Sequence, residues 1–153
     1  MFAQIEVQKK MKICETGIDR MFIIKLEPKD DILESLTLAA KENSIKNGFF
    51  TAIGAIDHAK IGYYQLDQKT YKPITLDGDF EVVSCIGNIT LKDNSPLIHA
   101  HLVIADKDGH AFGGHLLSGC LVSVTCEIFL LEAKSQIIRK LDDKFQLSLI
   151  SLD

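Results

Sequence analysis

The sequence is short of positive charge. Only two of its 153 residues are arginine, and the formal net charge is −4. Proteins that hold nucleic acid by its phosphates normally carry a basic stripe, so this composition disfavours a dedicated nucleic-acid-binding protein and leaves DNA as a weakly supported partner. Lys9, Lys10 and Lys12 form the only basic cluster, and such a cluster near a terminus is more often a solvated face.

Long apolar runs and regularly spaced cysteines are also missing. No run reaches the roughly 18 residues that a membrane helix needs, and the first residues lack the apolar core of a signal peptide, which predicts a cytoplasmic protein with no membrane partner. The four cysteines have no C-x-x-C spacing, so we expect reduced thiols. No Ser-His-Asp order, P-loop or Rossmann glycine pattern is present. With 46% apolar and 25% charged residues, residues 1–153 fit one globular domain.

One helix is predicted after Asp31. Asp31 and Glu34 have the spacing of a capping box. Apolar residues then recur at helical spacing, at positions 32, 33, 36, 39 and 40. Asn47 and Gly48 both tolerate the left-handed conformation that ends a helix. We expect this helix to lie on a sheet with its apolar stripe buried.

Most of the remaining chain has the composition of β-strands. The predicted strands are 20–27, 49–57, 60–66, 80–91, 97–105, 110–117 and 121–132, with 145–152 as a candidate last strand. Turn residues separate them, among them Asp77-Gly78 and the segment 106–109. Short connections indicate antiparallel pairing. The predicted fold class is α+β: a strongly curved antiparallel sheet with one flanking α-helix and a core at about 20–132.

Four of the five histidines lie in one segment, PLIHAHLVIADKDGHAFGGHL. His99 and His101 are two residues apart on a predicted strand, so they share a face at a spacing of about 7 Å. Imidazole is the commonest transition-metal ligand in proteins. His110, beside the turn, and His58, at a strand boundary, are expected at the surface.

Whether His115 joins this pair depends on the register of the hairpin. If Ala105 pairs with His110, His115 faces the wrong way. A register one residue tighter, or a bulge at the Gly-Gly pair before it, places His115 opposite His99. Three imidazoles can then hold a divalent metal with one position open. The alternative is an incidental cluster in which each imidazole bonds a carbonyl or water.

Glu81 is the candidate catalytic residue. Alternation along its strand places Glu81, Val83 and Cys85 on one face, and Phe80 and Val82 on the other. A carboxylate on an apolar face is costly unless it is paired. Glu81 could orient a ligating imidazole or act as a base. The alternative is a glutamate at a sheet edge in water.

Four segments of the chain, GFFTAIGAIDHAKIGYY, GDFEVVSCIGNIT, PLIHAHLVIADKDGHAFGGHL and GCLVSVTCEIFL, resemble in this order the plant and prokaryote conserved (PPC) domain. That domain follows AT-hooks in plant nuclear proteins and stands alone in bacteria and archaea. The resemblance covers about 20–132. It implies an α+β homotrimer in which His99, His101 and His115 occupy the family's histidine positions near a subunit boundary, where a metal, first of all zinc, can be held. Glu81 matches the family's acidic position.

Two functions remain as hypotheses. The first is a homotrimer with a three-histidine metal or small-ligand site and no assigned reaction; in an enzyme, the open metal position would act as a Lewis acid and Glu81 would assist proton transfer. The alternative is a DNA-binding or protein-interaction module, as stand-alone members of the family are often described. The chain has no Arg-Gly-Arg-Pro core of an AT-hook, and arginine is the residue that normally reads a narrow minor groove.

Overall fold

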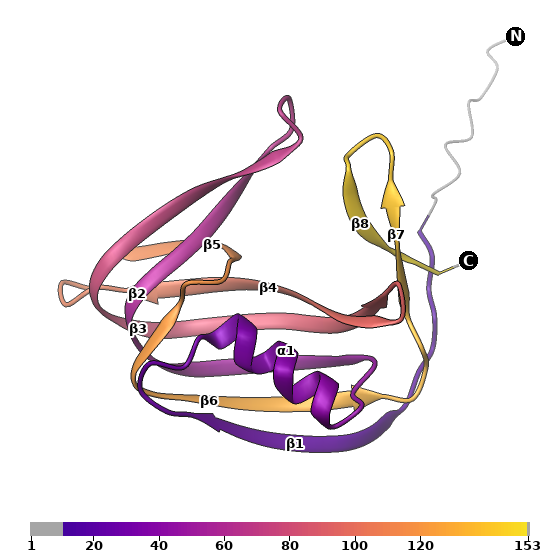
Figure 1. Cartoon of the computed structure of the whole chain (residues 1–153), viewed down its shortest axis with the longest axis horizontal. Helices are drawn as coiled ribbons and strands as arrows, with labels where there is room; N and C mark the ends of the chain where they lie inside the picture. The colour runs from indigo at the N-terminus through magenta and orange to yellow at the C-terminus, as the bar shows by residue number, and fades with distance from the viewer. Residues whose placement is uncertain (1–10, 153) are drawn as a thin grey trace, which may run out of the picture.

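The fold is an eight-stranded sheet with one α-helix on one of its faces (Figure 1), seen in a computed structural model that describes residues 11–152. Lys9 and Lys10 lie outside the described residues. In chain order the elements are β1 (Ile18–Leu26), α1 (Ile32–Glu42), β2 (Gly48–Gln65), β3 (Thr70–Lys92), β4 (Ser95–Ala105), β5 (Ala111–Leu116), β6 (Leu121–Ala133), β7 (Ile138–Asp142) and β8 (Leu147–Ser151). The predicted α+β class is confirmed.

The sheet curves because β2 pairs with three strands. Its order is β1-β6-β2-β5-β4-β3-β7-β8, with an additional pairing of β2 and β3. The first part of β2 pairs with β6, and its later part pairs with β5 at Ile61 and Gly62. The other edge of β2 follows β3. Since β3, β4 and β5 also pair in turn, the four strands β2, β3, β4 and β5 close on themselves. All these pairs are antiparallel, as predicted.

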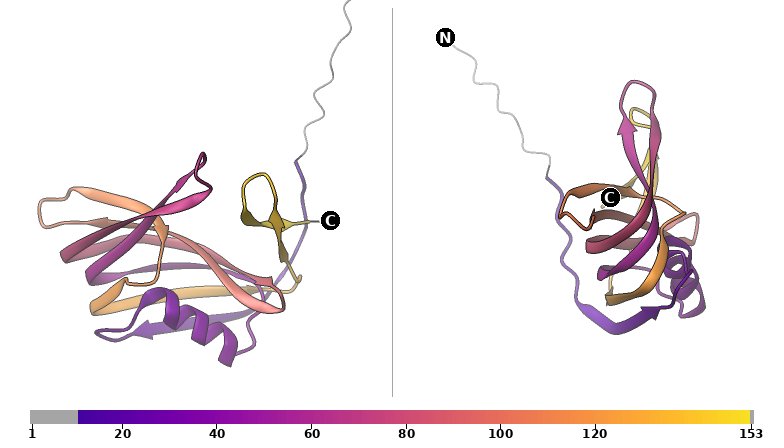
Figure 2. Two further views of the ribbon diagram at one scale, coloured as in Figure 1. Left: turned by 45° about the horizontal axis from the view of Figure 1, so that its top comes forward. Right: turned by 90° about the vertical axis from the view of Figure 1, so that its left-hand side faces the viewer.

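Helix α1 covers one face of the sheet (Figure 2). The side chain of Asp31 accepts a hydrogen bond of 2.9 Å from the backbone N–H of Glu34, which confirms the predicted cap. Ile32, Leu36 and Ala40 are fully buried in the core, as the apolar stripe predicted. The predicted end of the helix is wrong. The helix ends at Glu42, and Ser44, directly after the C-cap Asn43, has the left-handed conformation with a φ of 56°. Gly48 already begins β2.

Three strand predictions are also corrected. The segments 49–57 and 60–66 are one strand, β2, and Asp77-Gly78 lies inside β3 instead of ending a strand. Gly78 has a φ of 135° there, so its turn chemistry bends a long hairpin and does not close it. Strand β7 was not predicted, whereas the candidate last strand is present as β8.

The face of the sheet opposite α1 is apolar and exposed. Ile23, Phe49, Ile53, Ile86 and Phe129 all lie exposed to solvent in the single chain. We call these five residues the open face. The pairings place Ile23, Phe129 and Ile86 along one row across the sheet, which continues to the histidine-bearing strand β4. An apolar surface of this kind usually marks an interaction site.

Candidate metal site

The three predicted histidines come together on the side of the sheet away from the core. Ala100 and Leu102 of β4 are buried, so His99 and His101 between and beside them point the other way. His101 pairs directly with His115 of β5. The prediction that His115 would lie opposite His99 is therefore wrong, although His115 does face the same side.

The register explains how His115 reaches this face. Ala105 pairs with Ala111, so the hairpin is one residue wider than the simplest pairing and not one residue tighter. The pairing then runs without a shift up to His101 and His115. The Gly-Gly pair serves close packing instead of a bulge: a Cβ on Gly114 would lie 2.9 Å from the carbonyl oxygen of Gly62.

The three imidazoles are close enough to share one ion. Each offers a nitrogen, and these nitrogens all lie within 4.8 Å of one another. The ring centroids are separated by 5.4 Å for His99 and His101, 5.1 Å for His99 and His115, and 5.8 Å for His101 and His115. Tetrahedral zinc with Zn–N bonds near 2.1 Å needs nitrogens about 3.4 Å apart. Small rotations of the rings can close that difference.

Burial keeps two of these rings in the form that binds metals. Burial, and then the charges of His99, His101 and Arg139, lower the pKa of His115 to about 4. Burial and then Arg139 and His101 also lower the pKa of His99. Both imidazoles are therefore neutral at pH 7. Nδ1 of His115 is one of two buried side-chain atoms in the described part of the chain that have no hydrogen-bond partner. A buried polar atom without a partner is costly, and a metal shared by the three rings would give His115 a partner.

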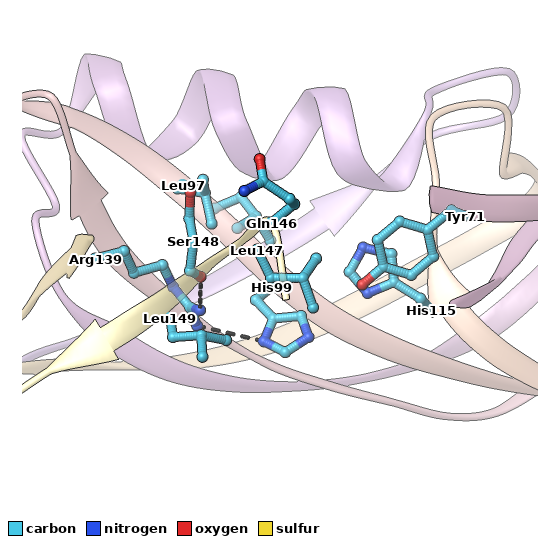
Figure 3. Close-up of a pocket in the computed structure, with 10 residues that line it drawn as sticks. Tyr71, Leu97, His99, His115, Arg139, Gln146, Leu147, Ser148 and Leu149 are labelled. Carbon is cyan, nitrogen blue, oxygen red and sulfur yellow. Dashed lines mark hydrogen bonds between the residues drawn. The ribbon is translucent and has the colours of Figure 1, made fainter. Parts of the chain in front are cut away.

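A cavity of about 270 Å³ adjoins the histidines (Figure 3). It lies between the hairpin of β2 and β3 on one side and the hairpin of β7 and β8 on the other, and the hydroxyl of Tyr64 joins the two hairpins by donating to the carbonyl of Phe145. Tyr71 stacks on His115 with ring centroids 4.4 Å apart and an interplanar angle of 20°. This contact restricts the ring of His115. The cavity is lined by Tyr71, Leu97, Ile98, His99, His115, Arg139, Gln146, Leu147, Ser148 and Leu149.

Arg139 reaches the site from β7. Its Nε donates to Oγ1 of Thr90 at 2.7 Å, and its Nη1 donates to the carbonyl of Ser148 at 2.7 Å. Its Nη2 donates to Oδ1 of Asn88 at 2.8 Å and to Nδ1 of His99 at 3.3 Å. Figure 3 shows His99 between Arg139 and the stacked pair of His115 and Tyr71. Sequence reasoning missed Arg139; its only signal is that it is one of two arginines in the chain.

Glu81 is not brought to the three histidines. It pairs with Ala105, four residues along β4 from His101, which is a distance of about 13 Å at the rise of a strand. The predicted alternation holds for Glu81 and Val83, which are exposed, and for Val82, but it is wrong for Cys85 because a register shift lies between Val82 and Ser84. Val82 and Cys85 are both buried, and Glu81 is exposed. A catalytic role for Glu81 stays a prediction.

A second group of potential metal ligands lies at the turn between β4 and β5. Asp106, Asp108 and His110, which we call the turn cluster, also bring ligand atoms within 4.8 Å of one another. His110 is exposed, as predicted, and His58 is partly exposed beside Asp77.

The model of the Plants and Prokaryotes Conserved (PCC) domain matches residues 14–134. The chain belongs to this family. The same family is abbreviated PPC, and the resemblance predicted from sequence is confirmed. Strands β7 and β8, with Arg139, lie beyond the last matched residue. In the described part of the chain, no helix has the length and apolar character needed to span a membrane.

Several solved PPC structures are similar over nearly the whole chain. A PPC protein from Pyrococcus horikoshii is 32% identical, with 94% of this chain and 99% of that chain covered and a TM-score of 0.85. A protein from Archaeoglobus fulgidus, described as metal-containing, is 32% identical over 92% of this chain and 99% of that chain, with a TM-score of 0.84. A candidate DNA-binding protein from Ralstonia eutropha JMP134 is 28% identical over 86% and 90% of the two chains, with a TM-score of 0.79.

A curated relative is much longer than this chain. The bifunctional protein GlmU of Synechococcus sp. (strain JA-3-3Ab) is 29% identical over 119 residues, which are 77% of this chain and 18% of that protein. The chain thus spans less than a fifth of the length of this relative. The match places a PPC-like segment within a larger protein and carries no activity over to this chain.

Proposed function

We propose that this chain is a cytoplasmic PPC protein that holds one divalent metal ion, zinc, between His99, His101 and His115 and offers the ion's open position to a small ligand. The observation that carries the proposal is the convergence of three imidazole nitrogens within 4.8 Å, one of the rings having a buried Nδ1 without a partner. Three neutral imidazoles are a ligand set typical of zinc with a free fourth position. The metal-containing relative from Archaeoglobus fulgidus supports the same interpretation.

The surrounding residues would fix the ligands of such a site. Strands β4 and β5 hold His101 and His115 in direct pairing, and Tyr71 packs on His115. Bound zinc would supply a Lewis acid at the mouth of the cavity. No reaction is assigned, since a metal ion and a cavity define a binding site but do not identify a catalysed reaction.

The test is the metal content of untagged protein by elemental mass spectrometry. We expect about one zinc per chain in the wild type and none in His99→Ala/His101→Ala, because that variant keeps one imidazole of three. Protein that takes up no zinc even after zinc is added would contradict the proposal. Far-ultraviolet circular dichroism of the variant checks that the sheet is retained.

We further propose that the open face joins copies of this chain as a homotrimer, the assembly that the family resemblance implies. Ile86, which pairs with His101, is part of the exposed apolar row, so burying the open face would also enclose the histidines from that side. Light scattering should give about three times the chain mass of 17.0 kDa. Ile86→Glu/Phe129→Glu should lower that mass, because it places charges on the apolar contact.

The second candidate function is an interaction module for DNA or proteins. The Ralstonia eutropha relative, described as a candidate DNA-binding protein, favours it, whereas the net charge of −4 opposes the DNA version. Of the two arginines, Arg139 is buried and Arg20 is paired with Glu132. We expect no DNA binding at about 150 mM salt. Affinity that persists there and falls steeply as salt rises would support the module.

A further inference from the structure

Arg139 is a buried cation whose hydrogen-bond partners are all neutral. Only 8% of its surface is exposed, and its four bonds go to Thr90, Ser148, Asn88 and His99. None of the ion pairs among the described residues involves it. The other arginine, Arg20, has a carboxylate partner in Glu132 although the Arg20 side chain is 48% exposed. The less accessible arginine is thus the one whose charge is not balanced.

The uncompensated charge of Arg139 lies at the wall of the cavity beside the histidines. A buried charge is costly unless an opposite charge compensates it. The lining of the cavity contains no aspartate or glutamate among the residues the structure describes. An anion in the cavity would supply the charge that the protein does not.

Metal binding at His99 would also free one donor of Arg139. Arginine has no acceptor, so Nδ1 of His99 receives the bond from Nη2 with its lone pair. If Nδ1 binds the metal, that lone pair is used. If Nε2 binds it, Nδ1 of the neutral ring carries the proton and cannot accept. In either case Nη2 of Arg139 loses its bond to His99 and has a donor available for a ligand.

We propose that this cavity binds a small aliphatic carboxylate, with the carboxylate against Arg139 and the apolar body against the leucines of the wall. The inference deepens the proposed metal site, on which it rests for the freed donor and for the expected coupling between the two ligands. A volume of about 270 Å³ suits a small molecule. Leu97, Leu147 and Leu149 provide apolar wall. Among the described residues of the lining, Arg139 is the only lysine or arginine, and the three leucines favour an anion with an aliphatic body over inorganic phosphate.

Butyrate and its neutral isostere butyramide test the inference by calorimetric titration of zinc-loaded and chelator-treated protein. We expect butyrate to bind the loaded protein at least tenfold more tightly than butyramide. Removing zinc should weaken butyrate at least fivefold, and by linkage butyrate should tighten zinc by the same factor. Equal binding of the two probes to the wild type would overturn the proposal, without the need for any variant.

Matched variants assign the preference to Arg139. Arg139→Gln should abolish the preference for butyrate, and Arg20→Gln, the same change at the other arginine, should keep it. Since Arg139 is buried and makes four hydrogen bonds, Arg139→Lys is the second variant: it should keep a weakened preference, because the charge stays and the planar fork is lost. A preference that survives in folded Arg139→Gln contradicts the inference.

Three further outcomes test the choice of anion and separate this inference from the metal site. Inorganic phosphate that binds more tightly than butyrate would overturn the choice of carboxylate. Butyrate binding that depends on Arg139 in a protein that takes up no zinc would support the anion site and refute the metal proposal. Zinc uptake without any preference for butyrate over butyramide would support the metal proposal and refute the anion site.

Discussion

The three histidines 99, 101 and 115, which we call the histidine cluster, lie on the same hairpin as the turn cluster. In both clusters the potential ligand atoms are equally close. Each brings three potential ligand atoms within 4.8 Å, yet their surroundings differ. His99 and His115 are half-buried on paired strands, with an unpartnered nitrogen on His115. In the turn cluster, Oδ1 of Asp106 already accepts hydrogen bonds of 2.9 Å from the backbone N–H groups of Asp108 and His110.

The comparison shows that closeness alone does not make a metal site. The carboxylate of Asp106 has a structural task, because its bonds close the turn, and the backbone hydrogen bond from His110 comes first among the causes that lower its pKa. The histidine nitrogens have fewer partners inside the protein. Unused bonding capacity in a partly buried place is therefore the property that distinguishes the two clusters.

The largest expected effect is the loss of zinc from only one of the clusters. In competition titrations with a chromogenic chelator, His99→Ala/His101→Ala should lose more than a hundredfold in zinc affinity, because two of three ligands are gone. Asp106→Asn/Asp108→Asn, the matched double change in the turn cluster, should stay within about twofold of the wild type. Equal losses in both variants would show that the distinction is mistaken.

The sequence could predict the pairing of His99 and His101, because residues two apart on a strand share a face. It could not predict the register that brings in His115. The backbone N–H of Asp106 bonds the carbonyl of His110 at 3.1 Å, which makes the loop one residue wider, and a slip of one residue turns every side chain to the other face. Such a bond depends on the turn as folded and leaves no periodic pattern.

Arg139 and Glu81 show where prediction of the site from sequence fails: Arg139 was missed, and Glu81 was predicted but lies away from the histidines. Strand β7 has five residues, too few for a pattern, and it is positioned by tertiary pairing with β3 and β8. Glu81 lies in a segment with clear alternation, but the register shift between Val82 and Ser84 moves Cys85 to the opposite face, so Glu81 does not share the buried face with it. The helix stripe could be predicted because it extends over several turns, where local pattern and tertiary burial agree.

The second expected effect is a pH dependence of the free energy of unfolding between pH 6.5 and 4, which we expect from the histidine cluster and not from the turn cluster. The pKa of His115 is about 4 in the folded protein against 6.5 for the free group. Between these values the unfolded chain binds more protons, so the free energy of unfolding of metal-free protein falls as pH falls through this window. After allowance for partial exposure, His115 should contribute up to about 2 kcal/mol.

Urea unfolding at pH 7 and pH 4.5 measures this slope. His115→Gln should flatten it, since the variant side chain does not titrate. Asp106→Asn should leave it unchanged, because a lowered carboxyl pKa stabilises the fold above its free value of 3.8 and loses that contribution only at lower pH. A slope that Asp106→Asn flattens and His115→Gln does not would reverse the assignment.

Substitution of two glycines should have a smaller effect on zinc affinity. It tests whether the position of strand β5 matters when all three histidine ligands are kept. A Cβ on Gly114 would meet the carbonyl oxygen of Gly62 at 2.9 Å and Cβ of Ile61 at 3.2 Å, so Gly114→Ala should displace β5 and weaken zinc binding about tenfold. Gly109, in the turn, has open space around its Cβ position but a φ of 80°. Gly109→Ala should cost about 1 kcal/mol of stability and leave zinc affinity unchanged. Equal zinc affinities of the two variants would indicate that His115 tolerates movement of its strand.

The smallest expected effect concerns the turn cluster alone. Asp106→Ala removes the acceptor of two backbone N–H groups and a contact of 3.1 Å with Nδ1 of His110. Because the turn is exposed, water can replace these bonds, and the free energy of unfolding should fall by only about 1 kcal/mol. Denaturant titration of the variant measures this change, and elemental analysis should find its zinc content equal to that of the wild type. Since His101 and His115 are already paired within β4 and β5, loosening the turn should not separate them. A lower zinc content in Asp106→Ala would mean instead that the side chain of Asp106 is needed to hold the register on which the histidine cluster depends.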